Sequence, residues 1–413
     1  MTQLRLAVIG CGAVGSAVAR LAVLKGVAKE VVCLDRDEEG AKRYLSFEGT
    51  CDIPVEHIDV LDKERVVPKL SGFDFVVNAL PTFVKVGRRE LPLNPAVMSA
   101  AIKAGAYYVD LACYGGRRTK AEQLSLTREF RKAALLAVIN FGASPGLSNM
   151  LAREAYDDLE AVNSIHIVSI EDQRGSSFVI PWSREEMLLT ASPVLVYRGR
   201  RFVWLEPFEE SAVFDFPSPL GSVRCYSVLN DESYTIPRFL RLNNLYYYAG
   251  GSDIETLRAL YRLGILSDEP VRVGKILVSP KELLYRILPS APKPSEVIRV
   301  CREGELEDAY FALEVVAEGE VGGEAAISKR FVLFPSQKRI NEVLPGATYI
   351  TYPTALCVVA LIRALRGRRL HGVFPGEALP KYLRKLILSY LEEDKVIVNE
   401  EFKLEELVKG PSA

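Results

Sequence analysis

Three glycines near the start of the chain have a spacing that could hold phosphate groups. They are Gly10, Gly12 and Gly15 in the segment VIGCGAVG, which follows a short apolar run and begins a helical pattern. In this spacing the first glycine permits a tight turn, the second lets a phosphate approach bare backbone, and the third lets the helix pack against the strand. Free N–H groups at the helix start then face the negative charge. The pattern predicts a dinucleotide site, although alone it would also fit an ordinary glycine-rich turn.

An acidic residue follows the turn at the distance expected for a ribose contact. Asp35 ends the next predicted strand, EVVCLD, where it would accept hydrogen bonds from ribose hydroxyls and repel a 2′-phosphate. This favours NAD, while the neighbouring Arg36 keeps NADP possible because a guanidinium could bind that phosphate. The residues expected to bind the cofactor are Gly10, Cys11, Gly12, Ala13, Val14, Gly15, Asp35, Arg36, Asp59, Val60, Asn78, Ala79, Leu80 and Pro145.

Side chains that could move a proton or bind a substrate follow later strands. Asp110 ends a predicted strand and could orient an amine or accept its proton, although a purely structural role is equally open. Tyr114 follows it and could reach the same pocket. Ser144 and Pro145 suggest the N-cap and first residue of a helix whose start could bind a carboxamide or a carboxylate. The catalytic candidates are Asp110 and Tyr114, and the substrate-binding candidates are Ser144, Gly146, Asn149, Arg238 and Tyr247.

Alternating strands and helices must position these residues. Apolar runs predict strands at residues 4–9, 30–37, 55–60, 73–80, 106–112 and 135–142. Helical patterns lie between them, for example at residues 63–70 and 94–105. Strands that alternate with helices predict an α/β fold, a parallel sheet with helices on both faces. Six such strands complete a dinucleotide-binding Rossmann sheet.

Several segments together resemble a known family. They are VIGCGAVG, VVNALP, AAIKAGAYYVDLA and FGASPGLSNMLAR, followed by IPWSREEMLLTASPVLVYRGR and GVFPGE. The chain resembles the saccharopine dehydrogenase-like family, in particular its lysine 6-dehydrogenase, saccharopine reductase and carboxynorspermidine dehydrogenase group. The resemblance implies an NAD(P)-dependent oxidoreductase acting on the C–N bond of a lysine-like amino acid or a saccharopine-like secondary amine. Two alternatives are a polyamine-branch enzyme that condenses an amine with an aldehyde reductively, and a homologue that binds NAD(H) without catalysis.

The same resemblance implies a domain arrangement. It leads us to expect a Rossmann domain of residues 1–145 and 346–413, interrupted by a substrate and dimerisation domain of residues 146–345, and a homodimer. The inserted domain is expected to be α+β with a mixed or antiparallel sheet. Short β segments fit this picture, with hairpin turns expected at residues 198–200 and 322–323.

The segment NLYYYAGG at residues 244–251 departs from the family pattern. Relatives carry an arginine near this point, which suits a bidentate clamp on an amino-acid carboxylate. Here three tyrosines stand instead, and Arg238 is a nearby substitute. Either another cation has taken over or the substrate lacks that carboxylate. Aromatic side chains would suit an amine through cation–π contact, or they simply pack in a strand.

The charge and composition of the chain limit the kinds of partner that it could bind. The 413 residues have a formal net charge of −1, which argues against broad binding to nucleic acid or to an anionic membrane. No signal peptide pattern is present, and the longest apolar stretch is interrupted by Arg363, so a cytoplasmic protein with a small amine or amino-acid substrate is expected. The seven cysteines are scattered without metal-binding spacing, which predicts mostly reduced thiols and no metal site.

Overall fold

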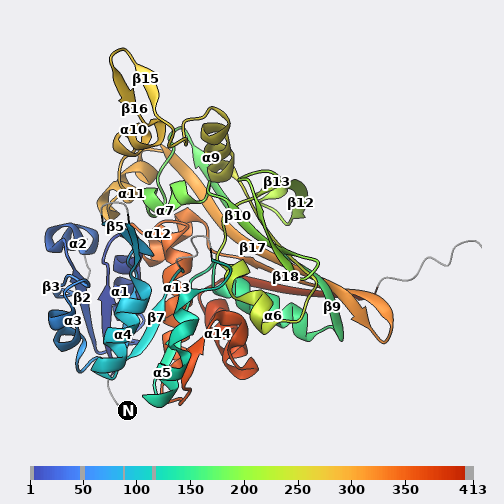
Figure 1. Ribbon diagram of the computed structural model, residues 1–413, viewed down its shortest axis with the longest axis horizontal. Coiled ribbons are helices and arrows are strands. Elements are labelled where there is room, and N and C mark those ends of the chain that lie inside the picture. The colour runs from blue at the N-terminus through green and yellow to red at the C-terminus, as the bar shows by residue number, and fades with distance from the viewer. Residues whose placement is uncertain (1–3, 47–51, 87–88, 114–117, 405–413) are drawn as a thin grey trace, which may run out of the picture.

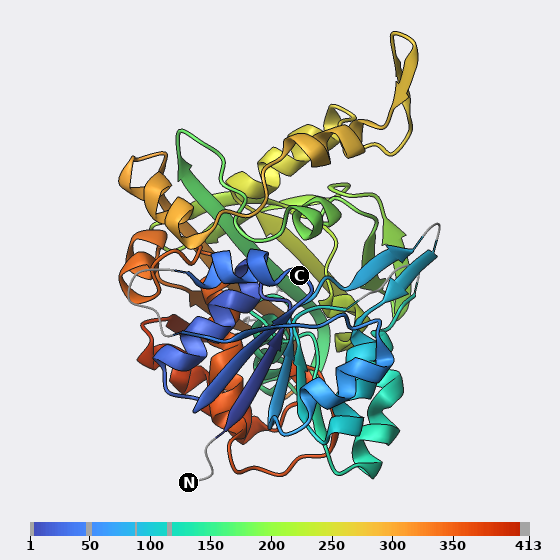
Figure 2. The same cartoon turned by 90° about the vertical axis from the view of Figure 1, so that its left-hand side faces the viewer.

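A computed structural model describes residues 4–46, 52–86, 89–113 and 118–404 of the chain. The chain forms two large sheets, a parallel one near the N-terminus and a long mixed one beside it (Figure 1). Figure 2 shows the strands of the first sheet fanning out below the second domain. Tyr114 belongs to the residues outside the described ranges.

The first sheet has seven parallel strands and confirms the predicted α/β fold. Their order is β19 (Gly372–Phe374), β8 (Leu136–Val138), β7 (Tyr107–Asp110), β4 (Phe75–Asn78), β1 (Arg5–Ile9), β2 (Glu30–Asp35) and β3 (Val55–His57). Six of the strands were predicted from sequence, and they lie in the order of a Rossmann sheet. The seventh, β19, has three residues, too few for a recognisable hydrophobic pattern, and it extends the edge beside β8.

Helices cover both faces of this sheet because its strands are apolar on both sides. In β1, Leu6 and Val8 face one hydrophobic cluster, whereas Ala7 and Ile9 face another. The first cluster includes α1 (Ala13–Leu24), α13 (Thr351–Leu365) and α14 (Lys381–Glu393). The second includes α3 (Lys63–Leu70), α4 (Asn94–Ala104) and α5 (Thr127–Lys132). Each fully buried Leu or Val contributes about 1.5–3 kcal/mol to folding.

The second sheet has nine strands and is mixed, as the α+β expectation allowed. The order is β11 (Arg201–Leu205), β10 (Val194–Arg198), β14 (Asn244–Gly250), β9 (Ala161–Gly175), β17 (Leu306–Val321), β18 (Glu324–Leu333) and β20 (Ile397–Leu404), while β12 (Ser211–Phe216) and β13 (Gly221–Ser227) branch from β14. The two predicted hairpins are confirmed, β10–β11 and β17–β18, with turns at residues 199–200 and 322–323. The pair β9–β14 is parallel.

The C-terminal residues differ from the expected domain boundary. The expectation placed residues 346–413 in the Rossmann domain, and α13 and α14 do pack there. Strand β20, however, pairs with β18 at the edge of the second sheet. The described chain therefore ends in the second domain. Most residues of β20 are exposed, which explains the charged pattern of this segment.

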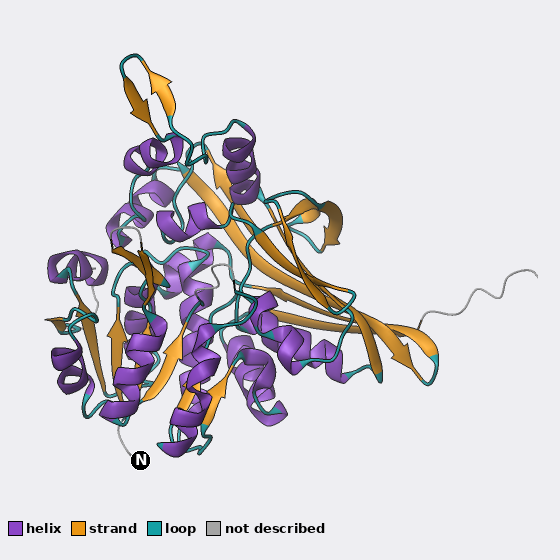
Figure 3. Cartoon of the chain, in the orientation of Figure 1, coloured by secondary structure: helices purple, strands orange, loops and turns teal. Residues whose placement is uncertain are grey.

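Further elements complete the chain and connect the two sheets (Figure 3). The helices are α2 (Glu38–Leu45), α6 (Leu147–Asp157), α7 (Arg184–Leu189), α8 (Ile236–Phe239), α9 (Ser252–Arg262), α10 (Pro280–Ile287), α11 (Pro294–Arg302) and α12 (Gln337–Val343). Two small hairpins are β5 (Phe83–Val86) with β6 (Arg89–Pro92), and β15 (Val271–Val273) with β16 (Ile276–Val278). Among the described residues, no helix has both the length and the apolar character needed to cross a bilayer.

Candidate functional site

The glycine-rich turn has the geometry that its spacing predicted. Gly10 has φ +84°, and a Cβ there would lie 2.9 Å from the backbone of Ala79 and Leu80. A Cβ on Gly15 would lie within 3.0 Å of the Gly10 backbone, so only glycine allows α1 to approach the turn this closely. A Cβ on Gly12, in contrast, would meet open space. The turn is therefore closed on two sides and open on the side where a ligand would approach.

That open side faces a cavity with a volume of about 540 Å³. Gly12 is the N-cap of α1, and no side chain caps this helix end. The first bond within the helix runs from the Ser16 N–H to the Gly12 carbonyl, so the N–H groups of residues 13–15 have no partner inside the helix. N–H groups without a helical partner, next to a turn that lacks side chains, suit the binding of a pyrophosphate group.

Asp35 lies at the end of this cavity beside the turn. One carboxylate oxygen accepts the Cys11 N–H at 2.7 Å and the other accepts the Asp37 N–H at 2.8 Å. Asp35, Arg36, Asp59 and Val60 all line the cavity, on the loops that follow β2 and β3. A carboxylate oriented by backbone donors and open to the cavity suits the two hydroxyls of a ribose.

Cys11 and Cys33 form a disulfide behind the turn. The sequence predicted mostly reduced thiols, and Cys113, Cys225 and Cys357 are indeed free among the described residues. The spacing of 22 residues gave no signal for the bond. It forms because the parallel pairing of β1 and β2 places Val8 opposite Cys33, and the chain leaving β1 then passes over β2.

The start of α6 differs from its sequence prediction. The helix begins at Leu147 with Gly146 as N-cap, and the peptide bond between Ser144 and Pro145 is cis. Ser144 is therefore not the N-cap and Pro145 is not the first helical residue. The Gly146 N–H is instead capped by the Asn149 side chain at 2.9 Å. Gly146 must be glycine because its φ is +120° and a Cβ would lie 2.5 Å from the Gly142 nitrogen.

Ser144 belongs to a network of hydroxyl groups at the far end of the cavity, away from the glycine turn and Asp35. It donates to Glu232 at 2.7 Å, and Ser148 donates to the same oxygen at 2.6 Å. The Ser144 and Tyr247 hydroxyl oxygens are 2.9 Å apart, and Tyr247 donates to Ser169 at 3.0 Å. The middle tyrosine of NLYYYAGG thus reaches the site, because alternation in β14 turns Tyr247 inward.

Four carboxylates line the cavity at this far end. Glu171 comes from β9, Glu186 from α7, and Asp231 and Glu232 from the segment after β13. Burial raises the pKa of Glu171 and of Asp231 to about 8. Burial also raises the pKa of Glu186 and Glu232, although hydrogen bonds from Thr82 and from Ser148 oppose the rise. With a pKa of about 8, Glu171 and Asp231 are mostly protonated at pH 7, and a nearby cation would favour their ionised form.

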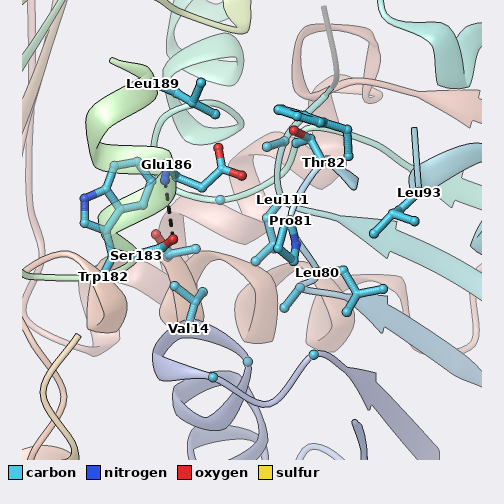
Figure 4. Close-up of a pocket in the computed structure, with 18 of the residues that line it drawn as sticks. Val14, Leu80, Pro81, Thr82, Leu93, Leu111, Trp182, Ser183, Glu186 and Leu189 are labelled. Atoms are coloured by element: carbon cyan, nitrogen blue, oxygen red, sulfur yellow. Dashed lines mark hydrogen bonds between the residues drawn. The ribbon is translucent and has the colours of Figure 1, made fainter. Parts of the chain in front are cut away.

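Apolar side chains and one indole separate the two ends. Figure 4 shows Glu186 extending from α7 toward the loop of Pro81 and Thr82, with Trp182 and Val14 nearby. The Trp182 Nε1 is buried and has no hydrogen-bond partner in the described structure. An unpartnered N–H on a cavity wall is an available donor for a bound acceptor group. The walls can therefore exclude water and still orient a polar ligand.

Asp110 lies behind the cavity rather than in its wall. Its carboxylate accepts the Asn140 N–H at 2.7 Å, the Tyr108 hydroxyl at 2.9 Å and the Gln123 amide at 3.1 Å. Burial raises its pKa to about 7. With three donors occupying it, Asp110 ties the ends of β7 and β8 together, which is the structural role that the sequence left open.

The structure brings most of the predicted cofactor residues to one wall. Those that line the cavity are Gly10, Gly12, Ala13, Val14, Gly15, Asp35, Arg36, Asp59, Val60, Ala79, Leu80 and Pro145, and of the substrate candidates Ser144 and Tyr247 do so. The others lie outside the lining: Cys11 is in the disulfide, Gly146 is the N-cap of α6, and Asn78 and Asn149 are buried in hydrogen bonds. Arg238 binds the Thr119 carbonyl at 3.0 Å.

The four carboxylates at the far end of the cavity were not predicted from the sequence. The four carboxylates are separated by up to 61 positions, from residue 171 to residue 232, and no spacing relates them. The adjacent pair Asp231-Glu232 in the segment LNDES was the one available signal. Among the described lining residues, Arg36 is the one lysine or arginine, and it lies at the opposite end beside Asp35.

The fold and this cavity define a dinucleotide-binding protein with a second domain over the far end of the cavity. Comparison with known families supports this for the N-terminal part of the chain. Residues 6–138 match the family model described as the saccharopine dehydrogenase NADP binding domain. This match covers the N-terminal part of the chain. It agrees with the resemblance found in the sequence and supports the binding of NAD(P) by this part.

Solved structures share the whole fold at low identity. A homospermidine synthase from Legionella pneumophila in complex with NAD has a TM-score of 0.66 and 16% identity, covering 99% of this chain and 94% of its own. An apo saccharopine dehydrogenase (L-Glu forming) from Saccharomyces cerevisiae has a TM-score of 0.63 and 13% identity, covering 97% and 100%. Both are similar to this chain in fold. No curated protein sequence matched it.

Proposed function

We propose that this protein is an NAD(P)-dependent oxidoreductase that acts on the C–N bond of a diamine or polyamine. The acidic far end of the cavity carries the proposal. Glu171, Glu186, Asp231 and Glu232 would bind ammonium groups, and the described lining offers no lysine or arginine there for a carboxylate.

The family resemblance left several substrate classes open, and the residues that line the cavity distinguish between them. Lysine-like and saccharopine-like amino acids carry a carboxylate, and the described lining offers no cation at this end of the cavity to neutralise it. The tyrosine at position 247 also replaces the expected clamp without neutralising an anion. A polyamine-type substrate has only positive groups, so it fits the same wall. The missing arginine and the acidic lining thus favour one substrate class.

The residues have separate roles in the proposed reaction. The turn at Gly12 would hold the pyrophosphate, and Asp35 would hold the ribose, with NAD preferred over NADP. When bound, the nicotinamide ring supplies the hydride acceptor or donor. Leu80, Pro145 and Trp182 would exclude water from the space between the two ends.

The carboxylates would also accept the proton that the substrate nitrogen must lose. Hydride can leave the carbon beside nitrogen only when that nitrogen has a lone pair, so an ammonium group must first lose a proton. Glu171 and Asp231 are suited to accept it, because a pKa of about 8 lets each exchange protons near neutral pH. In the reverse direction the same groups would return the proton to the amine.

A substrate panel tests the proposal. Protein is mixed with NAD⁺ or NADP⁺ and with a linear diamine, spermidine, lysine, ornithine or saccharopine, and the absorbance of the reduced nucleotide is followed. The reverse panel uses the reduced nucleotide with an aldehyde and an amine. Turnover with the diamine or spermidine is expected. Turnover with lysine or saccharopine alone would contradict the substrate class, and tight nucleotide binding without any turnover would favour the non-catalytic alternative.

A further inference from the structure

The disulfide between Cys11 and Cys33 joins the two parts of the nucleotide site that must stay aligned. Cys11 stands between Gly10 and Gly12 in the phosphate-binding turn, and Cys33 stands two positions before Asp35 in β2. Their Cα atoms are 6.0 Å apart, within the usual range for a disulfide. The bond therefore links the expected pyrophosphate contact directly to the strand that carries the expected ribose contact.

The same residue makes a second link to the same carboxylate. The Cys11 N–H donates to Asp35 at 2.7 Å, while its sulfur bonds to Cys33. Both cysteines are fully buried and neither lines the cavity. The cross-link therefore does not touch a bound nucleotide. It holds the residues that do, from the side opposite to the cavity.

Strand pairing alone does not fix this turn. The ladder between β1 and β2 ends at Ile9 opposite Leu34, and one further bond joins the Gly10 N–H to the Leu34 carbonyl at 2.9 Å. Beyond that point the turn contains two glycines, the residue type with the greatest backbone freedom. Cys11 is where the chain has left the ladder, so a cross-link there restrains the part of the turn that pairing leaves free.

We propose that Cys11 and Cys33 are positioning residues of the nucleotide site: their disulfide preorganises the glycine turn, and its reduction weakens NAD(H) binding. The inference rests on the nucleotide binding in the proposed function and not on the identity of the amine. Because binding and oxidation are linked, bound NADH must protect the disulfide by the same factor by which the disulfide strengthens NADH binding. This device would make cofactor affinity sensitive to thiol redox conditions.

The redox step needs a dithiol reductant. A thiolate of the dithiol attacks one sulfur of the pair, the Cys11–Cys33 bond breaks, and a mixed disulfide forms. The second thiolate of the reductant then closes the reductant into its own disulfide and releases the protein sulfur. Both cysteines become thiols, so two electrons and two protons move from the reductant to the protein.

Affinity measurements on matched forms test the inference. NADH is titrated calorimetrically into oxidised protein, into protein reduced with dithiothreitol under anaerobic conditions, and into Cys11→Ser, Cys33→Ser and the double variant. Cys301→Ser is the control, because Cys301 is a free cysteine away from the nucleotide site. Alkylation followed by mass measurement verifies the thiol state. The Kd of NADH is expected to rise about tenfold on reduction and in the cysteine pair variants, and to stay unchanged in Cys301→Ser.

A measurement on the unmodified chain covers the case in which a variant does not fold. The midpoint of reduction by dithiothreitol is compared with and without saturating NADH, and NADH is expected to shift the equilibrium about tenfold toward the disulfide. A cross-link that only stabilises the fold would lower the melting temperature on reduction without this shift.

The outcomes separate the two proposals. NADH affinity that is equal in the oxidised and reduced forms, with both thiols shown to be free, would overturn the positioning role while leaving the nucleotide site intact. Both cysteines open to alkylation in protein purified without reductant would overturn it as well. An absence of NADH binding in every form, oxidised included, would instead reject the nucleotide assignment of the proposed function.

Discussion

The two ends of the cavity are built in different ways. The nucleotide end uses backbone: a glycine turn, the start of α1 and one carboxylate, all within residues 10–35. The end proposed to bind the amine uses side chains, with carboxyl groups contributed by β9, α7 and the segment after β13. The nucleotide end should therefore tolerate side-chain changes except at its glycines and at Asp35. The end proposed to bind the amine depends on the individual charges, so specificity for the substrate could change there without disturbing the nucleotide site.

The largest effect is expected at the backbone end. Gly12→Val adds a branched side chain at a position where a Cβ atom would meet only open space. The side chain would therefore occupy the expected position of the pyrophosphate. NADH affinity should fall by at least about 100-fold, close to complete loss in calorimetry. Because nothing in the described chain lies within 4 Å of that Cβ, the melting temperature should stay nearly constant. Unchanged NADH affinity in the folded variant would show that the nucleotide does not lie on this turn.

Removal of one carboxylate from the end proposed to bind the amine should lower activity with the diamine and leave nucleotide binding unchanged. Glu171→Gln or Asp231→Asn should lower kcat/KM for the diamine by about 10- to 100-fold, since a charge-assisted hydrogen bond contributes about 1.5–3 kcal/mol. NADH affinity should change little. Glu122→Gln is the matched control, because burial also raises the pKa of Glu122 to about 7 but the residue does not line the cavity. Equal losses in all three variants would mean that the acids act through folding.

The pH dependence of binding should also distinguish the ends. Glu171 and Asp231 have raised pKa values of about 8, so at lower pH they carry protons and a cation must displace them. Diamine affinity should therefore increase as pH rises, by about tenfold between about pH 6 and pH 8. NADH affinity should be nearly flat over the same range. Isothermal titration in buffers of different ionisation heat would measure the released protons directly, and diamine affinity that falls with rising pH would contradict this arrangement.

The smallest effect is expected at Asp35. Asp35→Ala removes a ribose acceptor and the negative charge that disfavours a 2′-phosphate beside Arg36. The ratio of NAD to NADP affinity should fall by about fivefold to tenfold. Paired titrations with NADH and NADPH give this ratio, with Asp37→Ala as a neighbouring control. If the ratio does not move, Arg36 or another group determines the choice of nucleotide.

The comparison between the two ends also explains what the sequence could predict. Gly10, Gly12, Gly15 and Asp35 lie close together in the chain, and each is needed for a local backbone reason, so their spacing carries the signal. The β/α alternation around them was equally readable because each strand is a distinct apolar run. The domain match to residues 6–138 covers the same readable part of the chain.

The remaining features depend on contacts between distant residues. Glu171, Glu186 and Asp231 come to line one cavity only through the folding of the second domain, and no local pattern marks them. The short strand β19 and the pairing of β20 with the second sheet were not predicted, because contacts with distant strands, rather than their own sequence, define them. Asp110 looked catalytic because it ends a strand, yet three internal donors occupy its carboxylate.

A structure determined with NADH and a linear diamine would test the central claim most directly. The account predicts that the pyrophosphate lies over Gly12 at the start of α1, and that an amine nitrogen lies about 3 Å from a carboxylate oxygen of Glu171 or Asp231. A nucleotide bound elsewhere, or a diamine that avoids all four carboxylates, would contradict it.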